Sequence, residues 1–213
     1  MPGLVRIGLR DEHVEVGSHI AYFWESDAEF RDGVRFLTEG LASNDFCVIF
    51  GHEDANARVC AVLADQGHDC EELSAANRMC ILSGHKDANA MLESIGEAFQ
   101  RAVADGATLI RLLGNIGWGR QSWPSEREIM EFEGKVTAAA KAFPCVVVCM
   151  YDVRALPGQV IVHGAFETHP LTICGNMLRE NPYYLTFDEF LKRLDAREES
   201  HDGDKAGPSA PRQ

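Results

Sequence analysis

A chain of 213 residues, of which 46% are hydrophobic and 25% charged, is long enough to bury one sizeable core. Its formal net charge of −13 repels phosphate backbones and anionic lipid headgroups, so direct binding to nucleic acid or to a membrane surface is not expected. No apolar run reaches the roughly 18 residues that span a bilayer, and residues 1–15 lack the apolar core of a secretory signal, so a cytoplasmic protein is expected.

Apolar runs of strand length alternate with segments of helical periodicity. Strands are expected at 19–23, 46–50, 79–82, 108–113, 145–150 and 171–174. Helices are expected after Ser26, at 55–66, at 88–104, after Ser125, in a short segment at Pro157 and after Thr186. Each of the pairs Ser26–Glu29, Ser125–Glu128 and Thr186–Glu189 has the spacing of a capping box, which fixes where its helix begins.

This alternation predicts a three-layer α/β fold with a mostly parallel sheet and helices on both faces. The run CVVVCM at 145–150 has no polar alternation, which is typical of a central strand covered on both sides. Residues 1–16 are expected to be an N-terminal extension, 17–195 the domain, and 196–213 a disordered polar tail. The sequence does not predict the order of the strands.

The seven cysteines form an odd set without a C-x-x-C pair, and most lie in apolar runs, where thiols behave as small hydrophobes. Zinc and iron–sulfur sites favour clustered spacings. Neither a disulfide scaffold, a metal site nor a cofactor is therefore expected.

Ligands of open parallel sheets bind beyond the carboxyl ends of the strands, and here those ends carry aromatic residues with a few polar groups. Such a lining suits a small organic ligand better than a phosphate. The expected walls of the pocket are Tyr22, Trp24, Trp118 and Tyr151, and the expected polar contacts are His19, Glu25, Cys149 and His169. Residues such as Tyr22 and Trp24 are more often core or helix-staple residues than ligand contacts, and the alternative roles of Cys149 and His19 are only to fill core space and to bond the backbone.

No catalytic motif supports an enzyme, because the chain contains no recognisable Ser-His-Asp order, H-E-x-x-H or paired carboxylates. The loop GNIGWG at 114–119 lacks both the G-x-G-x-x-G spacing and the lysine of a phosphate-binding loop. A non-enzymatic protein is expected.

Several segments, in this order, resemble the MEDS domain, a sensory domain named for methanogens, methylotrophs and a dichloromethane-responsive regulator. They are HIAYFWES at 19–26, FLTEGL at 36–41, Gly114 with Trp118, VCMYD at 148–152, THPLTICG at 168–175 and ENPYY at 180–184. The resemblance implies a relative of the RecA-like ATPases of the circadian-clock type. It also implies sensing of a small hydrocarbon-derived compound, coupled to transcription or to a signalling kinase.

The chain departs from those ATPases where they carry the phosphate loop. The corresponding stretch reads WESDAE at 24–29, with no glycine or lysine and three carboxylates that would repel a triphosphate. The position of the magnesium-binding aspartate corresponds to Gly114 or Asn115. A degenerate phosphate loop that neither binds nor hydrolyses ATP is therefore expected.

No helix-turn-helix is recognisable, so the signal is expected to pass through a partner protein such as a histidine kinase or an anti-sigma factor. Two alternatives stay open. One is a protein-interaction module of degenerate ATPase fold whose pocket has closed, and the other is a thiol- or metal-based sensor that uses Cys149, His169 or His52.

Overall fold

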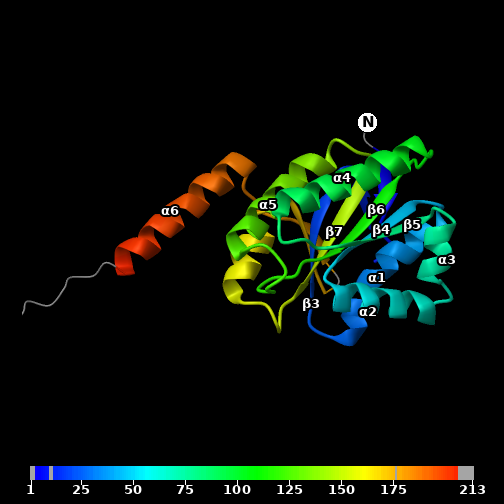
Figure 1. Ribbon diagram of the computed structural model, residues 1–213, viewed down its shortest axis with the longest axis horizontal. Coiled ribbons are helices and arrows are strands. Elements are labelled where there is room, and N and C mark those ends of the chain that lie inside the picture. Colours follow the sequence, from blue (N-terminus) through cyan, green and yellow to red (C-terminus); the bar gives the residue numbers. More distant parts are fainter. Residues whose placement is uncertain (1–2, 10–11, 176, 206–213) are drawn as a thin grey trace, which may run out of the picture.

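A seven-stranded sheet forms the centre of the protein, with strand order β5-β4-β6-β7-β3-β8-β9 (Figure 1). The computed structural model describes residues 3–9, 12–175 and 177–205. All neighbouring strands are parallel except β8 and β9, which are antiparallel. The strands are β3 (His19–Trp24), β4 (Phe46–Gly51), β5 (Met79–Ser83), β6 (Ile110–Asn115), β7 (Cys145–Asp152), β8 (Leu171–Cys174) and β9 (Met177–Glu180).

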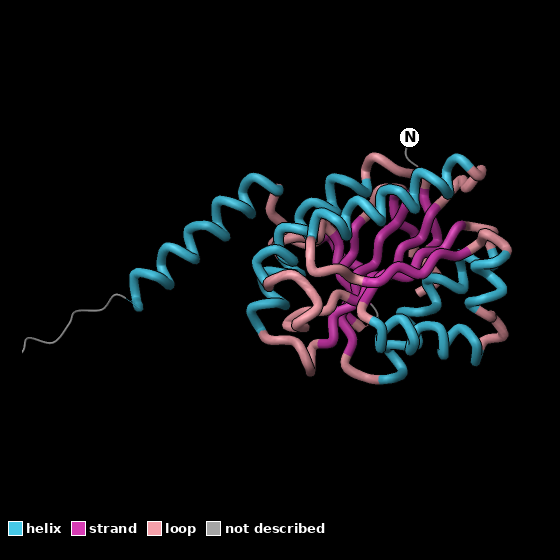
Figure 2. Tube along the Cα trace, in the orientation of Figure 1, coloured by secondary structure: helices cyan, strands magenta, loops and turns pink. Residues whose placement is uncertain are grey.

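Helices cover both faces of this sheet (Figure 2). One face carries α1 (Asp27–Ala42), α2 (Glu53–Asp65) and α3 (Cys70–Ala75), and the other carries α4 (Ala88–Ala104) and α5 (Glu126–Ala140). Each layer of helices closes a separate apolar core against the sheet. The structure thus confirms the predicted three-layer α/β class, including the central, fully covered strand β7.

The predicted capping boxes at Ser26 and Ser125 are formed and begin α1 and α5. In the first, the Glu29 carboxylate accepts hydrogen bonds from the backbone amides of Glu25 at 2.9 Å and Ser26 at 3.1 Å. Only these two residues, Glu25 and Ser26, connect β3 to α1. The helix entry is therefore a tight turn closed by its own carboxylate.

Four parts of the fold differ from the expectations. Helix α3 and strand β9 were not predicted, and the short helix near Pro157 is a π-helix, η1 (Val160–Phe166), which packs against α5. Helix α6 (Phe187–Lys205) follows Thr186 as predicted but continues past Ala196, so 196–205 is helical rather than part of a disordered tail. Residues 206–213 of that tail lie outside the described residues.

Apolar contacts of Phe190 and Leu194 with Met130, together with several ion pairs, attach α6 to the domain. Arg127 of α5 bonds Asp195 at 2.6 Å and Glu198 at 2.7 Å, and Arg197 forms two bonds, of 2.9 and 2.6 Å, to Glu167. At the other end of the chain, β1 (Leu4–Arg6) and β2 (His13–Glu15) form an antiparallel hairpin whose inward residues join the core beneath α1. The N-terminal segment thus packs onto the domain.

The strand order creates a crevice between β4 and β6. The chain leaves β4 for α2 on one face of the sheet, and it leaves the neighbouring β6 for α5 on the other face. The loops at the carboxyl ends of these two strands therefore diverge. Such a switch point is where open α/β sheets bind ligands.

Candidate functional site

A cleft of about 370 Å³ lies at this switch point, at the carboxyl ends of β3, β4, β6 and β7. Its aromatic walls are Trp24, from the end of β3, and Trp118, from the loop after β6. Polar side chains from three loops complete it: His52, Asn115 and Asp152. The cleft thus combines aromatic walls with a few polar groups at the edge where the sequence predicted a pocket.

Three hydrogen-bond donors around this cleft have no partner among the described residues. They are Trp24 Nε1, Trp118 Nε1 and Asn115 Nδ2, all of them buried. A buried donor left unpaired costs about 1–3 kcal/mol, so native proteins contain few of them. All three belong to residues that line the cleft, and a ligand with hydrogen-bond acceptors could satisfy them once a side-chain movement uncovers them.

Charged residues at the rim of the cleft are paired with one another. Arg58 lies 5.0 Å from the centre of the Trp24 ring and 3.8 Å from that of Phe30, and it also bonds Asp27. Arg120 bonds Asp54 at 3.0 Å. These arginines stack on or border the aromatic walls while their charge is neutralised locally.

His52 both lines the cleft and caps α2, because its Nδ1 accepts the amide of Ala55 at 3.2 Å. Burial, with a smaller contribution from Arg120, lowers the pKa of His52 below its ordinary value, and Asp54 opposes the shift. The unprotonated ring that the cap requires is thereby favoured.

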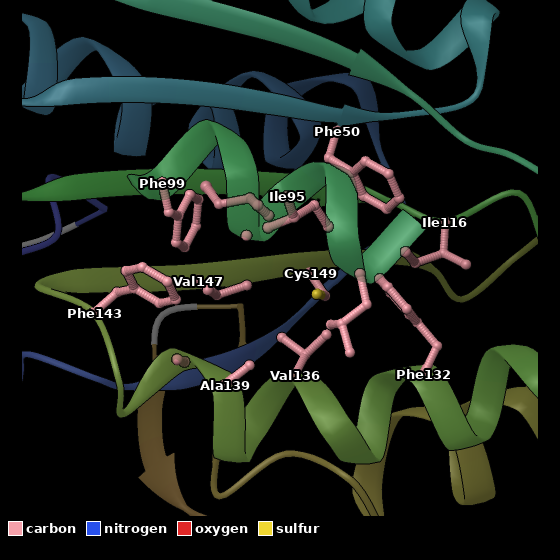
Figure 3. Close-up of a pocket in the computed structure, with 14 residues that line it drawn as sticks. Phe50, Ile95, Phe99, Ile116, Phe132, Val136, Ala139, Phe143, Val147 and Cys149 are labelled. Carbon is pink, nitrogen blue, oxygen red and sulfur yellow. The ribbon is translucent and has the colours of Figure 1, made fainter. Parts of the chain in front are cut away.

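A second hollow, of about 50 Å³, lies in the core between α4, α5 and the sheet (Figure 3). Its lining is apolar, with Phe50, Ile95, Phe132 and Val136 around it and the Cys149 thiol among them. An apolar cavity that binds a ring the size of benzene measures about 150 Å³. This hollow is therefore a packing void rather than the binding site of an organic ligand.

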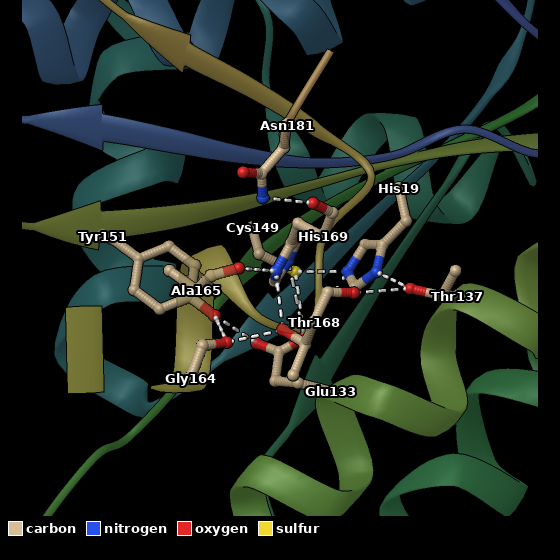
Figure 4. A network of polar contacts seen from close by, with 10 residues as sticks. All are labelled: His19, Glu133, Thr137, Cys149, Tyr151, Gly164, Ala165, Thr168, His169 and Asn181. Carbon is tan, nitrogen blue, oxygen red and sulfur yellow. Dashed lines mark hydrogen bonds and ion pairs between the residues drawn. The ribbon is translucent and has the colours of Figure 1, made fainter. Parts of the chain in front are cut away.

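Behind the cleft, His19, Glu133, Cys149 and His169 form a buried polar cluster (Figure 4). Their exposed fractions are 1%, 0%, 3% and 0%, and one donor atom from each lies within 4.8 Å of all the others. They come from four elements: the first residue of β3, the middle of α5, β7, and the turn between η1 and β8. The parallel pairing of β3 with both β7 and β8 brings them together.

Burial dominates the electrostatics of the cluster. It lowers the pKa of His19 to about 3 and, with a contribution from His19, that of His169 to about 3. It also raises the pKa of Glu133 and raises that of Cys149 well above its ordinary value. Both imidazoles are therefore neutral, and their approaches to Glu133 of 3.4 and 3.7 Å are not ion pairs.

Tyr151 connects the cluster with the cleft. Its hydroxyl lies 3.0 Å from Glu133 Oε1 and 2.9 Å from the Gly164 carbonyl oxygen, and its ring centre lies 6.4 Å from that of Trp118. The Trp118 indole packs against Gly164, and a Cβ added at this glycine would come within 2.7 Å of the indole. Two aromatic rings thus separate the cleft from the cluster.

The structure divides the eight residues proposed from the sequence into separate groups. Trp24 and Trp118 line the cleft. His19, Cys149 and His169 belong to the buried cluster, and Tyr151 adjoins it through Glu133 (Figure 4). The two others lie apart: Tyr22 is buried in the core beneath α1 and donates its hydroxyl to the Glu29 carbonyl at 2.6 Å, and Glu25 is exposed in the turn before α1.

Sequence reasoning missed Glu133, the carboxylate at the centre of the cluster. It lies on the inward face of α5, four residues after Ile129 and three before Val136. A carboxylate on an otherwise apolar helical stripe was the available signal, because glutamate is almost never fully buried unless it is paired. Sequence reasoning also missed Thr137, which lies one turn further along α5.

Comparison with known proteins places the chain in a family. The sequence profile of MEDS, the methanogen/methylotroph, DcmR sensory domain, matches residues 18–170. The transcriptional repressor DcmR of Methylorubrum extorquens is 26% identical over 137 residues, which are 64% of this chain and 51% of that protein. The chain thus spans about half the length of this curated relative. In the described part of the chain, every helix is too short or too polar to cross a bilayer. The profile matches the chain from the start of β3 to the turn before β8. Because this match covers most of the chain, the chain belongs to the MEDS family of sensory domains.

Proposed function

We propose that this chain senses a small organic molecule with hydrogen-bond acceptors, bound in the cleft between Trp24 and Trp118. The observation that carries this proposal is the group of unpaired buried donors, Trp24 Nε1, Trp118 Nε1 and Asn115 Nδ2, around one open cleft. Aromatic walls would hold the apolar part of the ligand, and the donors would select its polar atoms. The sensory family and the repressor relative support a regulatory role for this binding.

ATP is not the proposed ligand, because the helix entry that holds phosphate in nucleotide-binding folds is already occupied. The Glu29 carboxylate accepts the free amides of Glu25 and Ser26. A phosphate would have to displace this carboxylate and would meet Asp27 in the same turn. We therefore propose that the acceptor-bearing ligand binds away from this helix entry, against the indoles.

The signal is proposed to leave through another protein, such as a histidine kinase or an anti-sigma factor. A net charge of −13, which opposes direct contact of this chain with DNA, supports this proposal. Ligand binding would shift the population of the loop that carries Trp118, and with it the affinity for the partner.

The intrinsic fluorescence of the protein tests the binding proposal. The chain has three tryptophans, and Trp123 lies in the core against Gly84 and Gly117 rather than in the cleft. In a Trp123→Phe variant the emission therefore reports on the cleft alone. We would titrate this variant with short alcohols, aldehydes, ketones, carboxylic acids and haloalkanes, and follow fluorescence and melting temperature together.

At least one class with acceptor atoms should quench the emission saturably and raise the melting temperature. The same compound should lose both effects when Trp118→Ala or Asn115→Ala is added. Compounds without acceptors serve as the matched control and should bind more weakly. Saturable binding that survives both substitutions, or no response to any class, would refute the cleft as the sensory site and favour a ligand-free interaction module.

A further inference from the structure

Four of the six distances between the donor atoms of the buried cluster match those between the ligands of one metal ion, and the other two are no longer than 4.8 Å. A tetrahedral zinc site with bonds of about 2.0–2.3 Å has ligand-to-ligand distances of roughly 3.3–3.7 Å. His19 Nε2 lies 3.3 Å from Cys149 Sγ and 3.4 Å from Glu133 Oε2. Glu133 Oε2 lies 3.6 Å from Cys149 Sγ and 3.7 Å from His169 Nε2. The two nitrogen-to-oxygen contacts are too long for hydrogen bonds, yet they match edges of such a tetrahedron.

The hydrogen bonds of both histidines leave their Nε2 atoms unprotonated and directed at the centre of the cluster. The Thr137 hydroxyl donates its proton to the Thr168 carbonyl at 2.8 Å, so toward His19 Nδ1, also at 2.8 Å, it can only accept. His19 Nδ1 therefore carries the ring proton. His169 Nδ1 lies 2.9 Å from the Ala165 carbonyl oxygen, which can only accept, so this Nδ1 is protonated as well.

Both Nε2 atoms consequently present lone pairs to the centre of the cluster (Figure 4). His169 Nε2 is buried and has no hydrogen-bond partner among the described residues. Around the centre stand the two Nε2 acceptors, with Glu133 Oε2 as a third when its carboxylate is ionised, while the Cys149 thiol can donate only one proton. A cation at the centre would satisfy all three acceptors at once.

The surroundings of the cluster are those of a metal centre. Ligating histidines donate their other ring N–H to a carbonyl or a side-chain oxygen, and both histidines do so here. The Tyr151 hydroxyl holds Glu133 Oε1 and leaves Oε2 directed at the centre. The charge of a divalent ion is balanced by one carboxylate and one thiolate, and the two imidazoles are neutral. The whole site therefore has no net charge, which favours its full burial.

We infer that His19, Glu133, Cys149 and His169 bind one divalent transition-metal ion, with Zn²⁺ as the best match to the tetrahedral nitrogen, oxygen and sulfur donors. Binding transfers the thiol proton, and the carboxyl proton where Glu133 carries one, to solvent. The full burial of the donors indicates an ion taken up during folding. The site is separate from the cleft, so this inference does not rest on the proposed ligand.

Metal analysis of untagged protein tests the site. We would compare the wild type with Glu133→Gln, Cys149→Ala and Cys145→Ala. Cys145 is the matched control, because it is buried on the same face of β7 but its thiol bonds the Ala140 carbonyl instead of joining the cluster. The wild type and Cys145→Ala should carry about one zinc ion per chain, and the two cluster variants at least about tenfold less.

Refolding with Co²⁺ gives a readout from the intact cluster, and the comparison with Cys149→Ala is made on protein that circular dichroism shows to be folded. The experiment uses a Cys60→Ser, Cys145→Ala background, because the Cys60 and Cys70 thiols are hydrogen-bonded to each other and offer a competing site. The bound ion should show the visible bands of tetrahedral Co²⁺ and a near-ultraviolet charge-transfer band from one thiolate. Adding Cys149→Ala should remove the charge-transfer band.

Two results would overturn the site. One is wild-type protein that holds no metal as isolated and shows no tetrahedral Co²⁺ spectrum after refolding. The other is metal content or a charge-transfer band that persists at the wild-type level in Cys149→Ala or Glu133→Gln. Because the readout is the metal itself, a cleft that fails to bind any organic molecule leaves this result unaffected.

Discussion

Removing the carboxylate of the buried Asp45–Arg111 pair should destabilise the protein strongly. The Arg111 side chain is 2% exposed, and its Nε donates to Asp45 Oδ2 at 2.7 Å. Its remaining contacts are a 3.3 Å bond to the Phe36 carbonyl and the face of the Phe36 ring. Asp45→Asn leaves the guanidinium charge in the core with neutral partners only. The expected loss is about 3–5 kcal/mol, a large part of the 5–15 kcal/mol that stabilises a typical domain.

Urea unfolding followed by circular dichroism measures this loss. The matched control is Asp65→Asn, which breaks an exposed pair with Arg31 of almost the same length, 2.9 Å, and should change stability by less than about 0.5 kcal/mol. A double variant, Asp45→Asn with Arg111→Met, removes the stranded charge and should recover part of the loss. If Asp45→Asn costs less than about 1 kcal/mol, or if the double variant is less stable than the single one, the guanidinium is not isolated from water and the reasoning fails.

Three further outcomes are expected. Gly96→Ala, in the middle of α4, should raise stability by about 0.5–1 kcal/mol, since an added Cβ meets no atom within 4 Å; a loss would show that α4 packs more closely. The cap from His52 needs an unprotonated Nδ1, and the folded-state pKa is lowered, so its contribution of about 1 kcal/mol should be present above pH ~6.5 and disappear as the pH falls through the folded pKa. His52→Asn should keep the cap without this dependence when urea midpoints are compared across that range. Calorimetry with ATP and Mg²⁺ should detect no binding, and micromolar affinity would contradict the role given to Glu29 in blocking the helix entry.

Local signals in the sequence predicted much of the fold. Capping boxes located the starts of α1 and α5, and helical periodicity gave the bounds of α4. Helix α3, strand β9 and the length of α6 escaped because they depend on contacts that local patterns do not reveal, such as the bonds between Arg197 and Glu167. Periodicity also cannot distinguish a π-helix from an α-helix, which is why the geometry of η1 was unexpected.

The candidate sites were harder to predict, because they depend on the order of the strands. His19 and His169 are far apart in sequence, and they meet since β3 pairs with β8, which no local pattern predicts. Residue types at the strand ends pointed to the edge of the sheet where the cleft lies, but they could not separate side chains that reach the edge from those that point into the core. Trp24 and Tyr22 illustrate the limit: two residues apart on one strand, one lines the cleft and the other is buried beneath α1.

The contact between Trp118 and Gly164 allows the cleft to be perturbed without touching the buried cluster. A methyl group at position 164 would come within 2.7 Å of the indole and displace it, at a cost of about 1–3 kcal/mol. The bonds of Tyr151 and Thr168 go to the backbone carbonyl of Gly164 and would remain. Gly164→Ala should therefore alter tryptophan emission in the Trp123→Phe background and weaken ligand binding, yet keep the metal content of the wild type.

Gly158→Ala is the control, because a Cβ there meets no atom within 4 Å. If both alanine variants show the same emission, the indole does not rest on η1. If Gly164→Ala also loses metal, the two sites are not structurally separate, and the division between sensory cleft and metal centre has to be given up.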